Sequence, residues 1–281
     1  MSLRQFYPKR NSRHQVSSWK MAILYITIAI AILLQISYPL IEGESLRIVT
    51  IATVYWAAAA MCIHAVLAYG IKYASIFVST TFAYALIVEQ IGSKTGWPFG
   101  NYEYSGTLGY QIYGVPLVVP FAWVMIAHPL LIAARKITKN WVFLYGGLAM
   151  MAWDLFLDPQ MVASERWLWD FSGSHVPFQP EIPLSNMFGW LLTGMGLMAI
   201  LNKFLQVDRR KTKTSTLVPD LFLFWTLFSQ ILIGLRINIF KVIIVIGTFA
   251  LALAFAGNDL VNFIGVPIGA LQAYDIYVAG G

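Results

Sequence analysis

The sequence is dominated by long apolar stretches, each of which is long enough to cross a bilayer as a helix. Their approximate bounds are 20–40, 46–70, 73–92, 116–134, 141–158, 186–205, 217–235 and 237–256. A transmembrane helix needs about 20 predominantly apolar residues to span the hydrocarbon core. Only 11% of the 281 residues are charged and 58% are hydrophobic, whereas a soluble domain carries about 25% charged residues. We therefore expect an all-α, polytopic transmembrane helical bundle of about eight spans.

The domain organisation follows from where these stretches begin and end. We expect a basic cytoplasmic N-terminal segment over 1–20, a single membrane-embedded helical domain over 21–258 and a C-terminal tail over 259–281. No small-residue cleavage site follows the first stretch, so we expect an uncleaved helix and not a signal peptide. Very few residues join the last two stretches around Arg236, so a tight hairpin and a broken pair both remain open.

The Lys and Arg residues predict the orientation of the bundle. They cluster before the first span, after the fourth and after the sixth: Arg4, Lys9, Arg10, Arg13 and Lys20, then Arg135, Lys136 and Lys139, then Lys203, Arg209, Arg210, Lys211 and Lys213. Basic links favour the cytoplasmic side, so we expect a multi-pass protein of the cell membrane with a cytoplasmic N-terminus. Lys72 agrees with this orientation, whereas Arg236 does not. These links account for the net charge of +6, so nucleic acid is not an expected partner.

Two long loops, 93–115 and 159–185, follow on the predicted outer side and are expected to be ordered. Glu89 ends the third span near that side, and Asp154 and Asp158 end the fifth span near the same side. The topology therefore predicts that three carboxyl groups from two helices approach one level of the membrane. Acidic side chains at membrane depth are costly, so they mark a functional site by default.

Asp154 and Asp158 are the leading candidates for chemistry. They lie four residues apart, which places them on one face of a helix that we expect to end at Asp158-Pro159. Burial in apolar surroundings favours the neutral form of a carboxyl group, and such an acid beside a second carboxyl group is a recurring acid catalyst. Two alternatives remain open. Asp158 is exposed at the helix end, or Glu89 is a helix-end charge at the interface, with Gly92 after the helix.

The first loop is rich in aromatic residues between glycine and proline residues. They are Trp97, Phe99, Tyr102, Tyr104, Tyr110 and Tyr113. An interfacial aromatic belt would account for scattered Trp and Tyr at span ends. A long run interrupted by glycine residues is more typical of a functional loop, so we expect this segment to fold back over a site.

Metal and cofactor motifs are missing from the sequence. It contains one cysteine, Cys62, and no HExxH, CxxC, P-loop or GxGxxG pattern. His64 and His128 lie in separate spans without ligand spacing, so each is expected to be packed or hydrogen-bonded. The remaining inventory is an apolar cavity with aromatic side chains and acids, which permits proton transfer to a lipid-soluble alkene and capture of the resulting cation by water.

Three strings carry a family resemblance: EQIGSKTGWPFGNYEYS, WDLFLDPQMV and PLSNMFGW. They resemble the carotenoid-biosynthesis membrane proteins of the CruF-type carotenoid hydratases, over roughly 50–260. The resemblance implies a carbon–oxygen lyase that adds water, without a cofactor, to the ψ-end double bond of a linear C40 or C50 carotenoid. The matching positions are Glu89, Trp97, Tyr102, Trp153, Asp154, Asp158, Pro159, Asn186 and Trp190.

The roles of these residues are our own hypothesis. Asp154 would donate the proton, Asp158 would tune it or hold the water, and Glu89 would accept a proton from that water. Substrate contacts would come from Trp97, Tyr102, Trp153, Asn186 and Trp190. The expected partners are the carotenoid, water, the lipid bilayer and other membrane enzymes of the carotenoid pathway. The alternative is a protein that binds a lipid or isoprenoid without changing it, or a proton-coupled transporter.

Overall fold

The computed structural model describes residues 14–171, 173–205, 210–234 and 278. Long helices dominate this part of the chain: α1 (Ser18–Ser37), α2 (Gly43–Tyr69), α3 (Ile71–Thr95), α4 (Val118–Ile137), α5 (Val142–Ala163), α6 (Leu184–Phe204) and α7 (Leu217–Gly234). A short 3-10 helix, η3 (Tyr38–Leu40), follows α1. The expected helical architecture is thus confirmed in its coarse form.

Among the described residues, α1, α2, α3, α4 and α6 are long and apolar enough to cross a membrane, judged by length and composition. The count of about eight spans and the sidedness of the loops stay predictions. The predicted span 237–256 and almost all of the predicted tail 259–281 lie outside the described residues, as do residues 1–13 of the predicted N-terminal segment.

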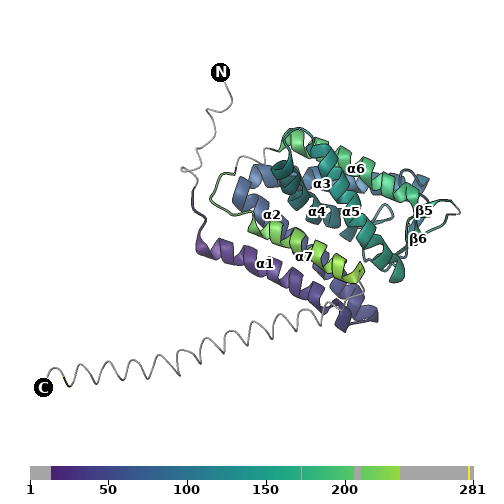
Figure 1. Cartoon of the computed structure of the whole chain (residues 1–281), viewed down its shortest axis with the longest axis horizontal. Helices are drawn as coiled ribbons and strands as arrows, with labels where there is room; N and C mark the ends of the chain where they lie inside the picture. The colour runs from purple at the N-terminus through teal and green to yellow at the C-terminus, as the bar shows by residue number, and fades with distance from the viewer. Residues whose placement is uncertain (1–13, 172, 206–209, 235–277, 279–281) are drawn as a thin grey trace. The chain divides into compact units, whose positions relative to one another are not determined.

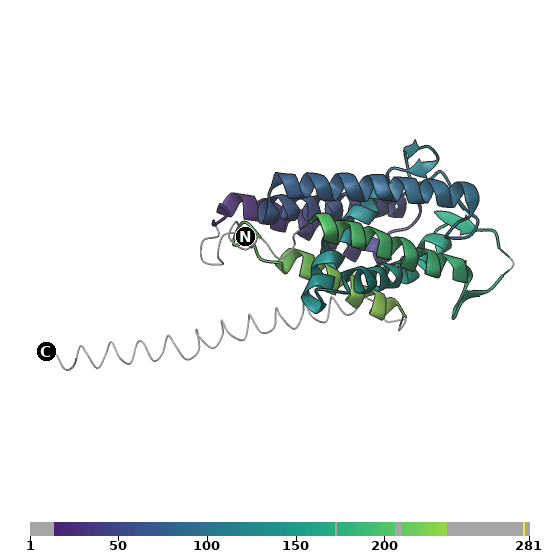
Figure 2. The ribbon, with the colours of Figure 1, turned by 90° about the horizontal axis from the view of Figure 1, so that it is seen from above.

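The helices of residues 14–230 lie side by side (Figures 1 and 2). Helix α5 packs most extensively against α6, and α1 packs against α2. Helix α4 packs against α2, α3 and α5, which places it in the middle of the bundle. Its central position agrees with its side chains, because most of them are buried, including Trp123 and His128.

Short antiparallel strands tie the two long loops together. Strand β1 (Tyr102–Tyr104) pairs with β4 (Trp167–Trp169), with Tyr102 opposite Trp169 and Tyr104 opposite Trp167. Two hairpins form separate sheets: β2 (Gln111–Ile112) pairs with β3 (Val115–Pro116), and β5 (His175–Val176) pairs with β6 (Gln179–Pro183). The strands gather at one end of the bundle (Figure 2). The two loops, which the topology predicted on one side, therefore meet at one end.

The end of α3 differs from the sequence prediction. We expected Gly92 to follow the helix, but α3 continues to Thr95, and Gly96 ends it with a left-handed φ of 72°. Gly92 serves packing instead, because a Cβ atom there would lie 2.7 Å from the Phe99 ring. The predicted alternative of Glu89 as a charge at the helix end is therefore wrong: Glu89 lies within the helix and is buried.

The end of α5 also differs from the prediction. The helix does not stop at Asp158-Pro159 but continues through Pro159 to Ala163. A proline inside a helix lacks the N–H that would bond the carbonyl four residues earlier, which here belongs to Leu155. The side-chain amide of Gln179 in β6 donates to that carbonyl oxygen at 2.8 Å. The second loop thus replaces the missing bond, and Asp158 is buried within a continuous helix.

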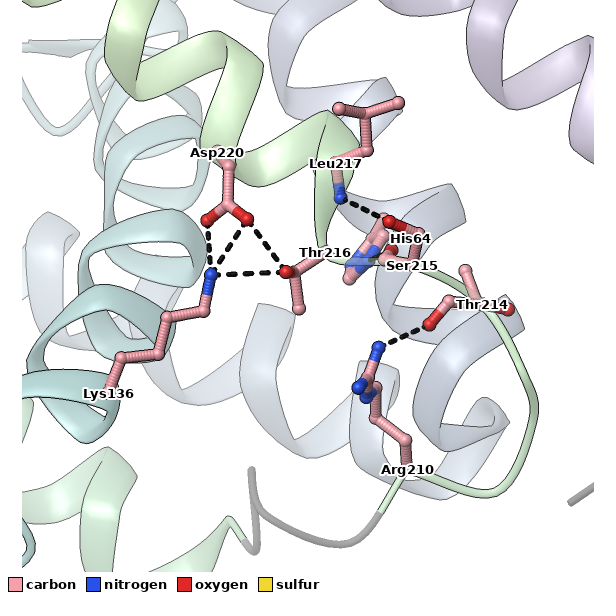
Figure 3. Close-up of polar contacts among 8 residues, drawn as sticks. All are labelled: His64, Lys136, Arg210, Thr214, Ser215, Thr216, Leu217 and Asp220. Atoms are coloured by element: carbon pink, nitrogen blue, oxygen red, sulfur yellow. Dashed lines mark hydrogen bonds and ion pairs between the residues drawn. The ribbon is translucent and has the colours of Figure 1, made fainter. Parts of the chain in front are cut away.

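At the opposite end of the bundle, residues 210–216 contact α2 and α4. Lys136 bonds both carboxyl oxygens of Asp220, at 2.6 and 2.7 Å, and also the Thr216 hydroxyl (Figure 3). His64 Nδ1 lies 2.9 Å from His128 Nε2, and His64 Nε2 lies 3.0 Å from the Ser215 carbonyl oxygen. The prediction that both histidines are packed or hydrogen-bonded is confirmed.

Helices α5 and α6 approach closely at glycine residues. A Cβ atom on Gly147 would lie 2.8 Å from the Met195 backbone nitrogen, whereas one on the adjacent Gly146 would meet only the side chain of Met198. Small residues at helix crossings allow backbones to approach in this way. This crossing fixes α5, which carries Asp154 and Asp158, against α6.

We predict that Gly147→Ala lowers the free energy of unfolding by about 1–3 kcal/mol, because its methyl group meets backbone atoms that cannot move aside. Gly146→Ala is the matched control and should destabilise less, since a methionine side chain can change rotamer. Thermal unfolding of both purified variants in detergent measures the difference. Equal stability of the two variants would contradict this description of the crossing.

Candidate active site

The described residues enclose a cavity of about 150 Å³ at the end of the bundle that carries the loops. Glu89 of α3, Asp154 and Asp158 of α5, and Asn186 of α6 all line it. The two loops contribute aromatic side chains, and α1, α2 and α4 complete the wall. The structure therefore brings together the three acids that the sequence placed on two helices.

The Asp154 and Asp158 side chains share one donor. Both residues are almost fully buried, with 1% and 2% of their surface exposed. Asn186 Nδ2 donates to Asp154 Oδ2 at 2.8 Å and to Asp158 Oδ2 at 2.5 Å. Trp167 Nε1 donates to the other oxygen of Asp158 at 3.2 Å. One amide nitrogen thus reaches both carboxyl groups and holds the two acids beside each other.

Glu89 has a separate set of donors. The Tyr102 and Tyr104 hydroxyls donate to its Oε2 at 2.7 and 2.8 Å, and Trp123 Nε1 donates to its Oε1 at 3.0 Å. A carboxylate accepts hydrogen bonds at both oxygens and donates none. These three donors match that acceptor, whereas the Asp154–Asp158 pair is bridged by a shared amide.

The two tyrosine residues lie in the first loop, outside the spanning helices. Burial raises the pKa of Tyr102 and of Tyr104, and the nearby Glu89 carboxyl group raises it further. Both hydroxyls therefore keep their protons at neutral pH and remain donors. Tyr102 and Tyr104 are two residues apart in β1, so their side chains lie on one face of the strand and both reach Glu89. The intervening Glu103 is exposed.

Aromatic rings form much of the remaining wall. The Trp123 and Trp190 rings stack with their centroids 4.6 Å apart, and Trp153 stacks on Phe222 at 5.7 Å. Trp169 Nε1 donates to the Phe99 carbonyl oxygen, which fixes that indole. The cavity thus combines acidic groups with the faces and edges of several aromatic side chains.

Most of the predicted site residues lie at this cavity. Tyr102, Trp153, Asn186 and Trp190 line it together with the three acids. Trp97 lies apart: its side chain is 61% exposed and lines a separate groove between α3 and α6. It is not among the described residues that line the cavity.

Several lining residues were not among the predicted site residues: Tyr104, Trp123, Trp167 and Trp169. Three of them could have been found from spacing. Tyr104 follows Tyr102 by two residues and Trp169 follows Trp167 by two, so each pair shares one face of a strand. Trp123 offers no such signal, because it lies in an apolar helix where an aromatic residue is ordinary.

Comparison with known proteins identifies the family of this chain. The family model described as "Carotenoid biosynthesis protein" matches residues 48–256. The chain belongs to this carotenoid biosynthesis family. The matched range contains all eight predicted site residues, and it includes α3 to α6 and both loops.

A curated relative of this family member is a protein named bisanhydrobacterioruberin hydratase, from Haloarcula japonica. It is 35% identical over 118 residues, which cover 40% of this chain and 39% of the relative. The similar region thus spans well under half of either protein. No solved structure matches the chain.

We predict that Asn186→Leu lowers the free energy of unfolding by about 1–3 kcal/mol, because it removes the donor that two buried carboxyl groups share. Thr193→Val is the matched control on the same helix, since among the described residues the Thr193 hydroxyl bonds only the Gly189 carbonyl one turn earlier. Thermal unfolding in detergent compares the two variants. A smaller loss for Asn186→Leu than for Thr193→Val would contradict the bridging role.

Proposed function

We propose that this chain is a membrane-embedded carotenoid hydratase, a carbon–oxygen lyase that adds water to the terminal double bond of a linear carotenoid. The observation that carries the proposal is the buried Asp154–Asn186–Asp158 arrangement beside Glu89 in one aromatic cavity. Family membership and the name of the relative support the same reaction class.

The size of the cavity favours an end group over a whole polyene. A cavity of about 150 Å³ holds a group about the size of benzene, which corresponds to one isoprenoid unit. A linear carotenoid would therefore insert its tip and leave the rest of the polyene outside, in the bilayer. This arrangement restricts reaction to terminal double bonds.

The first step of the proposed reaction is protonation of the terminal alkene. Asp154 donates its proton to the less substituted carbon, a carbon–hydrogen bond forms, and a tertiary cation remains on the neighbouring carbon. Negative charge develops on the Asp154–Asp158 pair, and the Asn186 amide that both acids share stabilises it. A positioned general acid contributes roughly 100- to 10,000-fold to a rate.

The cation is then stabilised and captured. The faces of Trp153, Trp190 and Tyr102 attract a cation, and all three residues line the cavity. Water attacks the cation, a carbon–oxygen bond forms, and Glu89 accepts the proton that the water releases. Tyr102, Tyr104 and Trp123 donate to the Glu89 carboxyl group and hold it in position for this step. The sum is addition of one water, with no net proton change after the acids re-equilibrate.

The membrane setting belongs to the same proposal. We infer a multi-pass protein of the cell membrane with a cytoplasmic N-terminus, in which the carotenoid arrives from the bilayer and other membrane enzymes of the pathway supply it. Five described helices are apolar enough to span, which supports this setting.

A second candidate function uses the same cavity without chemistry. A protein that binds an isoprenoid or couples its transport to protons would also bury acids beside an apolar pocket. The burial of Asp154 beside Asp158 favours a stored proton in both cases. Only a hydratase changes the mass of the ligand.

Expression of the chain in a lycopene-producing bacterium tests the proposed function. We predict new pigments heavier than lycopene by one or two waters, identified by mass spectrometry of the extracted carotenoids. Lycopene recovered unchanged, from cells that contain the folded protein in their membranes, would favour the binding or transport function.

We predict that Asp154→Asn lowers formation of the alcohol by at least about 100-fold, because it removes the proton donor. Asp170→Asn is the matched control, since Asp170 is an exposed acid that does not belong to the cavity wall. Both variants should accumulate in the membrane at wild-type levels. Retained alcohol formation by Asp154→Asn would remove this residue from the role.

A further inference from the structure

The same cavity has a second polar region that the proposed reaction does not use. Gln35 at the end of α1, Tyr38 in η3, and Thr50 and Thr53 of α2 line the wall of the cavity. The acids come instead from α3 and α5 and their amide partner from α6. Residues of the central helix α4, which include Val119, Ala122 and Ile126, lie among the apolar lining.

Three side chains in this region carry hydroxyl groups: Tyr38, Thr50 and Thr53. The Tyr38 hydroxyl lies in the same cavity wall as the Thr50 and Thr53 side chains. Thr50 and Thr53 each donate to the carbonyl of the preceding turn, at Leu46 and Val49, both at 2.8 Å. A hydroxyl oxygen that donates one bond still accepts others, so both threonines retain acceptor capacity.

Gln35 provides an acceptor that is not yet satisfied. Its Oε1 atom is buried and has no hydrogen-bond partner among the residues that the structure describes. Buried polar side-chain atoms in proteins are nearly always paired, so an unpaired one needs an explanation. An O–H group bound beside Gln35 would supply the missing donor.

We propose that Gln35, Tyr38, Thr50 and Thr53 form a neutral subsite that binds a hydroxyl group while the alkene tip lies at the acids. The hydroxyl group belongs either to the isoprenoid end group itself or to a water molecule held in the cavity. Because the cavity holds only about one isoprenoid unit, a hydroxyl group on the ligand must lie in the same end group as the alkene. This inference rests on the proposed function for the identity of the ligand.

The chain offers a matched control for this region. Thr27 of α1 is buried and donates to the carbonyl of Ile23 at 2.7 Å, as Thr53 does to Val49. Unlike Thr53, it is not among the described residues that line the cavity. Thr27→Val and Thr53→Val therefore remove the same type of bond, and only Thr53→Val changes the cavity.

Binding of two five-carbon probes to the full chain in lipid nanodiscs tests the subsite. The probes are isoamylene, a branched alkene, and prenol, which carries a hydroxyl group on the same skeleton. Tryptophan fluorescence reports binding, because the cavity is lined by Trp123, Trp153, Trp167, Trp169 and Trp190. We expect the wild type and Thr27→Val to prefer prenol by about 5- to 10-fold in Kd, and Thr53→Val and Gln35→Leu to lose that preference.

Turnover of lycopene by the same variants distinguishes the two sources of the hydroxyl group. If water occupies the subsite, no variant prefers prenol, and Thr53→Val and Gln35→Leu both form less alcohol from lycopene than Thr27→Val does. Wild-type binding and turnover in both cavity variants would overturn the subsite. Binding does not require turnover, so prenol preference without any hydration would refute the proposed function and leave the subsite standing.

Discussion

The burial of three carboxyl groups in one apolar cavity is the constraint on which the rest of this structure depends. Acids in such surroundings are costly unless they are hydrogen-bonded or neutral. The chain meets this cost with donors from several elements: Asn186 from α6, Tyr102 and Tyr104 from β1, Trp123 from α4 and Trp167 from β4. The acids therefore have different sets of donors. Asp154 and Asp158 share the Asn186 amide, whereas Glu89 has three separate donors.

The loops explain how side chains so far apart in the sequence meet. Strands β1 and β4 pair across the two loops, and their alternation turns tyrosine and tryptophan side chains toward the acids. The second loop also supplies Gln179, which replaces the bond that Pro159 removes from α5. Without that amide the Leu155 carbonyl would lose its hydrogen-bond donor, and the turn that carries Asp158 would lose support. The loops thus shape the site as well as cover it.

Much of the site could be predicted from the sequence because topology and spacing carry it. Two spans separate the loops, which predicted both loops on one side, and the four-residue spacing predicted Asp154 and Asp158 on one face. Local rules failed where tertiary contacts override them. Pro159 predicted a helix end, but a distant side chain rescued the helix, and Gly92 resembled a cap but accommodates the Phe99 ring. Trp123 gave no signal, since its role depends on a neighbour in another helix.

Heavy water provides the most direct test of the claim that buried acids protonate the polyene. The proton on the acid exchanges with solvent, so each hydration in heavy water should leave one deuterium bound to the carbon beside the new alcohol. Mass spectrometry and NMR of the purified pigment would locate it. The account predicts one such carbon-bound deuterium for every alcohol formed from lycopene. An alcohol that lacks it, with its oxygen derived from molecular oxygen, would contradict the account.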